Sequence, residues 1–156
     1  MKNKTLKNIL SALAVAFFGY ILLNFTFIID FLFQTLIDKE VKIFLSIEGN
    51  KIWLWYPAVK HLFFLFLIVL LSRYIFKSKL KTIYKNIYFT VPLSAIYVTA
   101  GMFLYRWPIA AFLTSSYFFF GFLYFFKRTK LSWLYYYTLI LVTLVFLIGS
   151  LLGTQI

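Results

Sequence analysis

The sequence predicts an all-α integral membrane protein, a polytopic transmembrane helical bundle of about five spans that forms a single membrane domain over residues 1–156. Of its residues, 63% are hydrophobic and only 13% are charged, whereas a soluble domain is about half apolar and about one quarter charged. The mean hydropathy is +0.91. Because a fold in water could not cover so much apolar surface, lipid is the solvent that this composition fits.

The first span is expected over residues 9–33. A basic N-terminus precedes it, but the apolar run that begins at Ile9 is longer than the core of a signal peptide, so we interpret it as an uncleaved helix. The polar segment that follows, 34–56, contains no apolar run long enough to cross a membrane. We expect it to be an outer loop that lies on the membrane, with the aromatic residues of 53–56 at the level of the lipid head groups.

The remaining spans follow from the length of the apolar blocks. A helix needs about 20 apolar residues to cross a hydrocarbon core about 30 Å thick. The block 87–126 would be about 60 Å long as one helix, so it must contain two spans. Arg106, with two interfacial aromatic residues and Pro108 beside it, marks the break. The four further spans are therefore expected at residues 57–76, 87–105, 108–126 and 131–152.

The distribution of lysine and arginine predicts the orientation of the bundle. The N-terminus and the segments 73–85 and 127–130 hold most of the 16 basic residues and none of the four acidic ones. By the positive-inside rule, these segments face the cytoplasm. Five spans then place the N-terminus in the cytoplasm and the C-terminus outside, in a multi-pass protein of the cell membrane.

A polar stripe on the first helix is the first candidate site. Thr26, Asp30, Gln34 and Asp38 are spaced four residues apart, which puts them on one face of a helix. Polar groups that faced lipid would each cost several kcal/mol, so this face is expected to point into the bundle or into water. Asp30 lies about 32 Å beyond the start of the span, near the outer boundary of the membrane.

Basic residues of other helices are expected at the same depth as this stripe. Lys60 and His61 begin the second span, and Arg106 lies in the outer turn between the third and fourth spans. We therefore predict one polar binding cluster, open to the outside, formed by Asp30, Gln34, Lys60, His61 and Arg106. The alternative interpretation is that Asp30 already reaches water and that Lys60 and Arg106 extend to the lipid head groups.

Small residues at four-residue spacing predict contacts between helices. Gly149 and Gly153 form such a pair near the outer end of the last span, and Ala111 and Ser115 form another in the fourth. These pairs would contact helices of the same chain or of another subunit.

Several chemistries are excluded by residue types that the sequence lacks. Without cysteine there is no disulfide, iron–sulfur cluster or thiolate catalyst, and a single histidine cannot form a bis-histidine haem site. No metalloprotease motif or catalytic triad can be identified. We therefore expect no metal, no cofactor and no catalytic residue. The basic residues flank apolar spans instead of forming a polar face, so nucleic acid is not expected as a partner.

Three functions are compatible with these observations. We favour a non-catalytic subunit or assembly partner of a larger membrane complex, because such a protein needs spans, small-residue contact faces and few buried charges. The alternative is a small-solute or ion transporter, or a substrate-binding membrane component, that uses the outward-facing polar cluster. A membrane-embedded lipid-modifying enzyme is less well supported. The expected partners are the lipid bilayer and another membrane protein or further copies of the chain.

Overall fold

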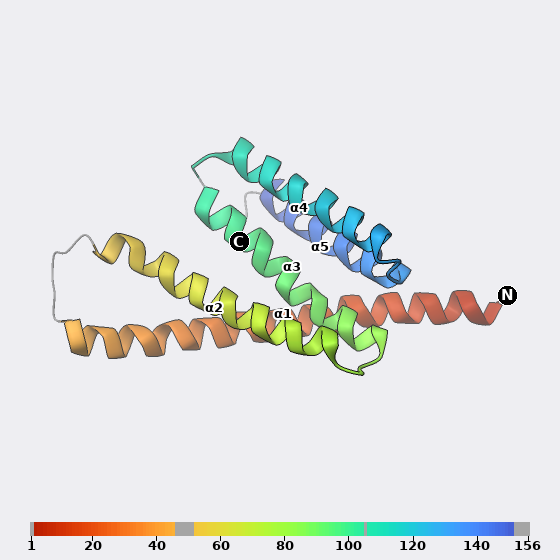
Figure 1. Cartoon of the computed structure of the whole chain (residues 1–156), viewed down its shortest axis with the longest axis horizontal. Coiled ribbons are helices and arrows are strands. Elements are labelled where there is room, and N and C mark those ends of the chain that lie inside the picture. The colour runs from red at the N-terminus through yellow and green to blue at the C-terminus, as the bar shows by residue number, and fades with distance from the viewer. Residues whose placement is uncertain (1, 46–51, 105, 152–156) are drawn as a thin grey trace.

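The fold is a bundle of five helices (Figure 1). The computed structural model describes the backbone of residues 2–45, 52–104 and 106–151, and the side chains of residues 4–39, 59–104 and 106–150. Each of the five helices is long and apolar enough to cross a membrane, which confirms the prediction of about five helices with the length and composition of membrane spans. The helices are α1 (Lys2–Leu45), α2 (Ile52–Lys77), α3 (Thr82–Leu104), α4 (Pro108–Arg128) and α5 (Trp133–Leu151).

Successive helices run in alternating directions (Figure 1). The start of α1, the connection from α2 to α3 and the connection from α4 to α5 lie at one end of the bundle, which we name the basic end. The segments richest in lysine and arginine, 73–85 and 127–130, belong to this end. The turn between α3 and α4 lies at the opposite end. The segments that the charge pattern assigns to one side of a membrane are therefore together in space.

Helix α3 is the central element of the bundle. It contacts each of the other four helices, and in Figure 1 it lies between α1 and α2 on one side and α4 and α5 on the other. In its apolar window, 44% of the residues are buried, compared with 11% in α1 and 6% in α4. Short polar side chains of α3 are among the buried ones, since Asn86 and Ser94 are fully covered. Small and hydroxyl-bearing residues let helices approach closely in a membrane, which explains the central place of α3.

The closest approach of α1 and α3 lies at Gly19 and Thr90. A Cβ atom built on Gly19 would lie 2.7 Å from the Thr90 Cγ2 atom, which is too close for any side chain. The Thr90 Oγ1 atom, whose proton is donated to the Ile87 carbonyl oxygen at 2.8 Å, also lies 3.4 Å from the Gly19 carbonyl oxygen. The absence of a side chain at Gly19 therefore allows α1 to pack directly on the central helix.

An aromatic core joins α3, α4 and α5 near the basic end. Phe126 of α4 is 2% exposed, and its ring packs 5.7 Å from that of Phe89 and 5.9 Å from that of Tyr135, centroid to centroid. Leu139 of α5 is completely buried in the same cluster. Because Phe126 is the one residue of α4 that is buried in the described structure, α4 is anchored at this end.

One expectation about the chain between the first two spans is wrong. The outer loop expected over residues 34–56 is shorter, because α1 continues to Leu45 and α2 already begins at Ile52. No glycine or proline occurs between Gly19 and Gly49, so nothing in the sequence ends the helix where it becomes polar. The polarity of residues 34–45 marks the end of the apolar segment and not the end of the helix.

The turn between α3 and α4 forms around Arg106. Helix α3 ends at Leu104, and Pro108 occupies the first turn of α4, where its missing N–H costs no hydrogen bond. The Trp107 amide donates to the Leu104 carbonyl oxygen at 2.8 Å, which closes the turn.

Candidate functional site

Polar side chains of α1, α2 and α3 meet in one layer toward the end of the bundle opposite the basic end. We name this set the polar layer. On α1, the Gln34 side-chain amide donates a hydrogen bond of 2.9 Å to the Asp30 Oδ2 atom, as their four-residue spacing allows. The other carboxylate oxygen, Asp30 Oδ1, is buried and accepts no hydrogen bond from the described part of the chain. The polar layer comprises Asp30, Gln34, Asp38, Lys60, His61 and Thr99.

His61 of α2 connects the layer to the central helix. It is 9% exposed, and its Nε2 atom lies 2.9 Å from the Thr99 hydroxyl. The single proton of that hydroxyl is already donated to the Ala95 carbonyl oxygen at 2.5 Å. Thr99 Oγ1 must therefore accept from His61, which places an N–H on Nε2 of the ring. The carboxylate of Asp30 interacts electrostatically with the same ring.

Lys60 and Asp38 form an ion pair between α2 and α1. Their Nζ and Oδ1 atoms are 2.7 Å apart, and the exposed fractions of the two side chains are 9% and 40%. The lysine is the residue next to His61, and Asp38 lies two turns beyond Asp30, so the pair closes the layer toward the end of the bundle. Two rings strengthen the same region, since Phe33 stacks on Phe63 at 5.8 Å.

Four residues of the predicted cluster belong to the polar layer. They are Asp30, Gln34, Lys60 and His61. Arg106 lies in the exposed turn between α3 and α4, at the same end of the bundle, and its part in a common site stays a prediction. Sequence reasoning did not assign Thr99 to the site or pair Asp38 with Lys60, because both contacts depend on which helices are neighbours.

The chemistry of the polar layer is limited by its composition. Among the described residues, no three histidine, cysteine, aspartate or glutamate side chains are grouped so that they could hold a metal ion. The layer offers hydrogen-bond acceptors on Asp30, one ring on His61 and one cation on Lys60. Such a set suits a small polar ligand or a proton, held by hydrogen bonds and charge.

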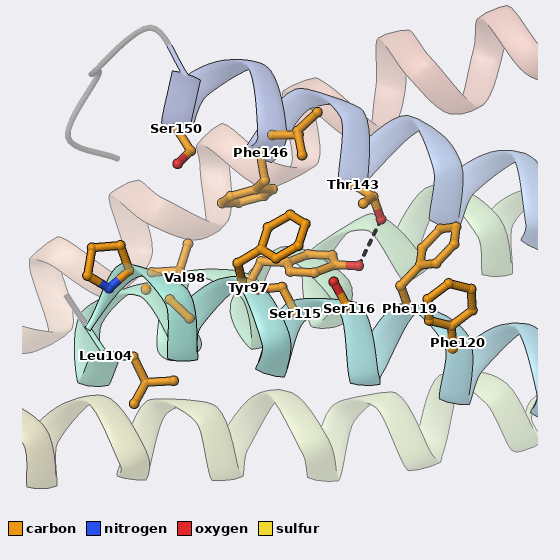
Figure 2. Close-up of a pocket in the computed structure, with 15 residues that line it drawn as sticks. Tyr97, Val98, Leu104, Ser115, Ser116, Phe119, Phe120, Thr143, Phe146 and Ser150 are labelled. Atoms are coloured by element: carbon orange, nitrogen blue, oxygen red, sulfur yellow. Dashed lines mark hydrogen bonds between the residues drawn. The ribbon is translucent and has the colours of Figure 1, made fainter. Parts of the chain in front are cut away.

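A cavity of about 710 Å³ lies between α3, α4 and α5 (Figure 2). Aromatic side chains and hydroxyl groups line it, and none of its lining residues in the described part of the chain is charged. At its wall the Tyr97 and Thr143 hydroxyls are 2.8 Å apart in a hydrogen bond, which Figure 2 shows between α3 and α5. The residues of α4 that line the cavity lie between Pro108 and Phe120, toward its start and away from the buried Phe126.

The small residues that predict helix contacts have different surroundings. Ala111 and Ser115 of α4 both line the cavity. Gly149 is half-buried near the end of α5, and Gly153 lies outside the described residues. A contact of either pair with a helix of another subunit stays a prediction.

The chain has no match among protein families, curated proteins or solved structures.

Proposed function

We propose that the chain is a non-catalytic subunit that assembles with other transmembrane helices in a larger membrane complex. The support comes from the side of α1 that points away from α3. We name this side the outer face of α1. Its apolar members are 41% to 70% exposed in the chain by itself. The outer face comprises Leu13, Phe17, Tyr20, Asn24, Phe27 and Phe31.

The observation that carries the proposal is the position of Asn24. This side chain is exposed in the middle of the apolar part of α1, five residues beyond the Gly19 contact with α3. Its Nδ2 atom donates one hydrogen bond of 2.8 Å to the Tyr20 carbonyl oxygen of the same helix. One N–H and the side-chain oxygen of the amide have no partner in the described part of the chain.

An amide that faces hydrocarbon is unfavourable. Moving such a group out of water without a hydrogen-bond partner costs about 2 kcal/mol or more. Purely lipid-facing surface needs only apolar side chains, so an asparagine at this depth favours a contact with another polar group. Polar side chains on facing helices are the usual source of such contacts in membranes. A neighbouring helix on the outer face therefore explains Asn24 better than lipid does.

The test is the mass of the particle extracted in mild detergent. We expect a protein mass above the 18.5 kDa of one chain, and we expect the Asn24→Leu variant to shift toward the single chain. Phe25→Leu is the matched control, because Phe25 is 58% exposed next to Asn24 but points to another side of the helix. A homogeneous single-chain particle for the wild-type protein would contradict the proposal.

The orientation in the membrane belongs to the same proposal. We place the basic end in the cytoplasm, supported by the grouping of the basic segments at one end of the bundle (Figure 1). The chain has no cysteine, so single cysteines at Lys79, Lys130 and Arg106 report accessibility without background. We expect a membrane-impermeant thiol reagent to label the cysteines at positions 79 and 130 from one side of the membrane and the cysteine at position 106 from the other. Labelling of positions 79 and 130 from different sides would contradict this orientation.

A second function is supported by Asp30 Oδ1, which accepts no hydrogen bond from the described residues. A buried carboxylate oxygen without a hydrogen-bond donor can bind a proton, an ion or a polar solute. The polar layer could then be the binding site of a small-solute or ion transporter.

Transport can be tested in proteoliposomes with gradients of protons, sodium or potassium. Transport should be lost in Asp30→Asn and kept in Thr35→Val, an exposed position one turn away whose hydroxyl bonds only its own helix. Equal flux in wild type and Asp30→Asn would exclude this function for Asp30.

A further inference from the structure

We propose that the outer face of α1 pairs with the same face of a second copy of this chain, in parallel, with the two Asn24 side chains hydrogen-bonded to each other. This inference rests on the proposed function, because it names the partner that covers the outer face. It is carried by the spacing, the length and the polar group of that face.

The spacing of the outer face is that of a two-helix contact. From Leu13 to Phe31, its members follow one another at alternating distances of about four and three residues, which is the seven-residue repeat of packed helix pairs. In a helix this repeat places the six residues of the outer face in one continuous stripe along the axis, which we call the seam. Asn24 is rotated about 140° from Gly19 around the helix axis, so the seam lies away from α3.

The length of the seam matches the membrane. The distance from Leu13 to Phe31 is about 27 Å along a helix, close to the hydrocarbon thickness of about 30 Å. Asn24 lies about 16 Å from the Leu13 end, well inside the seam. Lys7 precedes the seam and Asp30 adjoins its other end, so charged groups lie near both limits of the apolar segment. The seam therefore extends over the part of α1 that lipid or another helix must cover.

The chemistry of Asn24 favours a second copy over an unrelated helix. All copies of one chain insert in the same orientation, so their α1 helices are parallel and their Asn24 residues lie at the same depth. After its bond to the Tyr20 carbonyl, each amide retains one donor and one acceptor. Two such amides across a two-fold axis satisfy each other reciprocally, in a self-complementary contact. A different partner would need a polar residue at this same depth.

Single-cysteine cross-linking in native membranes tests this arrangement. The chain contains no cysteine, so each variant carries one thiol. Oxidation should give a dimer of the chain from Phe17→Cys and Tyr20→Cys, which lie in the seam. The matched controls are Phe18→Cys and Phe25→Cys, which are 52% and 58% exposed but lie about 100° or more around the helix from the seam. They should give little dimer.

Random collisions between copies can also give cross-links, so the affinity of the dimer is measured as well. Resonance energy transfer between two labelled populations in vesicles gives the association constant of the dimer. Asn24→Leu should lower that constant by about threefold to thirtyfold, the range expected for one hydrogen-bonded pair between membrane helices. Asn24→Gln, which keeps the amide, should retain more of the association than Asn24→Leu. Equal constants for wild type and Asn24→Leu would overturn the role of the amide.

The outcomes separate this inference from the proposed function. Equal cross-linking at seam and control positions would overturn the paired seam. A cross-link from the seam to a protein of different mass would overturn the second copy as partner and would support the proposed function. No cross-link at any position, together with a single-chain particle, would overturn both. Because all four positions are exposed, cysteine there leaves the packing of α1 on α3 intact.

Discussion

Asn24 of α1 and Asn86 of α3 are the same residue type in two very different environments. Asn86 is completely buried, donates a hydrogen bond of 2.8 Å to the Thr82 carbonyl oxygen, and its Oδ1 atom lies 3.3 Å from the Thr138 Oγ1 atom of α5. Asn24 is exposed and bonds only its own backbone. The fold buries one amide between its helices and leaves the other exposed. The comparison teaches that the chain itself covers the middle of α3, whereas it leaves the outer face of α1 uncovered.

The two helices also differ in what surrounds their middle. Around Thr90 and Ser94, α3 is covered by its neighbours, while the bulky residues of α1 are largely uncovered. Both helices are apolar enough to span a membrane, and α1 is the more apolar of the two. Hydropathy thus identifies candidate spans, and small and polar residues mark the helix that the other helices of this chain cover.

The largest effect is expected at the contact between the two helices. Gly19→Val places atoms where a Cβ alone would be 2.7 Å from Thr90 Cγ2, so the Thr90 side chain or α1 itself must shift. We expect a loss of about 1–3 kcal/mol in the free energy of unfolding, as for other overpacked sites. Unfolding in mixed micelles with increasing SDS measures it. Gly121→Val is the control, since a Cβ there meets nothing within 4 Å. Equal losses in both variants would contradict the close approach.

A smaller loss is expected when the buried amide is removed. Asn86→Leu deletes the hydrogen bond to the Thr82 carbonyl oxygen and the 3.3 Å contact with Thr138 Oγ1, whose proton is donated to the Leu134 carbonyl oxygen at 2.8 Å. The expected cost is therefore about 1–2 kcal/mol, measured by the same SDS titration. An unchanged unfolding curve would show that the buried amide contributes nothing to the contact between α3 and α5.

The ion pair between Lys60 and Asp38 should contribute less to the free energy of unfolding than Asn86 does. Because the Asp38 side chain is 40% exposed, water screens its attraction to Lys60. A double-mutant cycle with Lys60→Met and Asp38→Asn is expected to give a coupling energy of about 0.2–1 kcal/mol. A coupling above that range would mean that the pair is more enclosed than its exposure indicates.

The smallest effect on the stability of a single chain is expected at the exposed amide. Asn24→Leu should change the unfolding free energy of the monomer by less than about 0.5 kcal/mol, because the side chain is exposed and its hydrogen bond goes to its own helix. The measurement is made in excess detergent, where copies are diluted from one another. A loss as large as that of Asn86→Leu would remove the contrast between the two asparagines.

The number of helices could be predicted from the sequence because it depends on local properties. Apolar length alone gives the candidate spans, and Arg106 with Pro108 marks where the longest apolar block must turn. The end of α1 could not be predicted from polarity. Thr35 shows why, since its hydroxyl bonds the Phe31 carbonyl oxygen and is accommodated within the helix.

The candidate site could be predicted only where it depends on one helix. The bond between Gln34 and Asp30 follows from their spacing. The pairing of Lys60 with Asp38 and of His61 with Thr99 joins residues 22 and 38 positions apart. Spacing along one helix carries no information about such contacts, because they require the order of helices in the bundle.

The length of α1 has a consequence for what lies outside the lipid. Its 44 residues correspond to about 66 Å, more than twice the hydrocarbon thickness. Membrane helices are usually tilted by about 20° and at most about 40°, so tilting cannot submerge all of it. If the part from Lys7 to Asp30 crosses the core, the remaining 15 residues up to Leu45 form a rod about 22 Å long. That rod projects past the head groups, where a water-soluble antibody or protease could reach it.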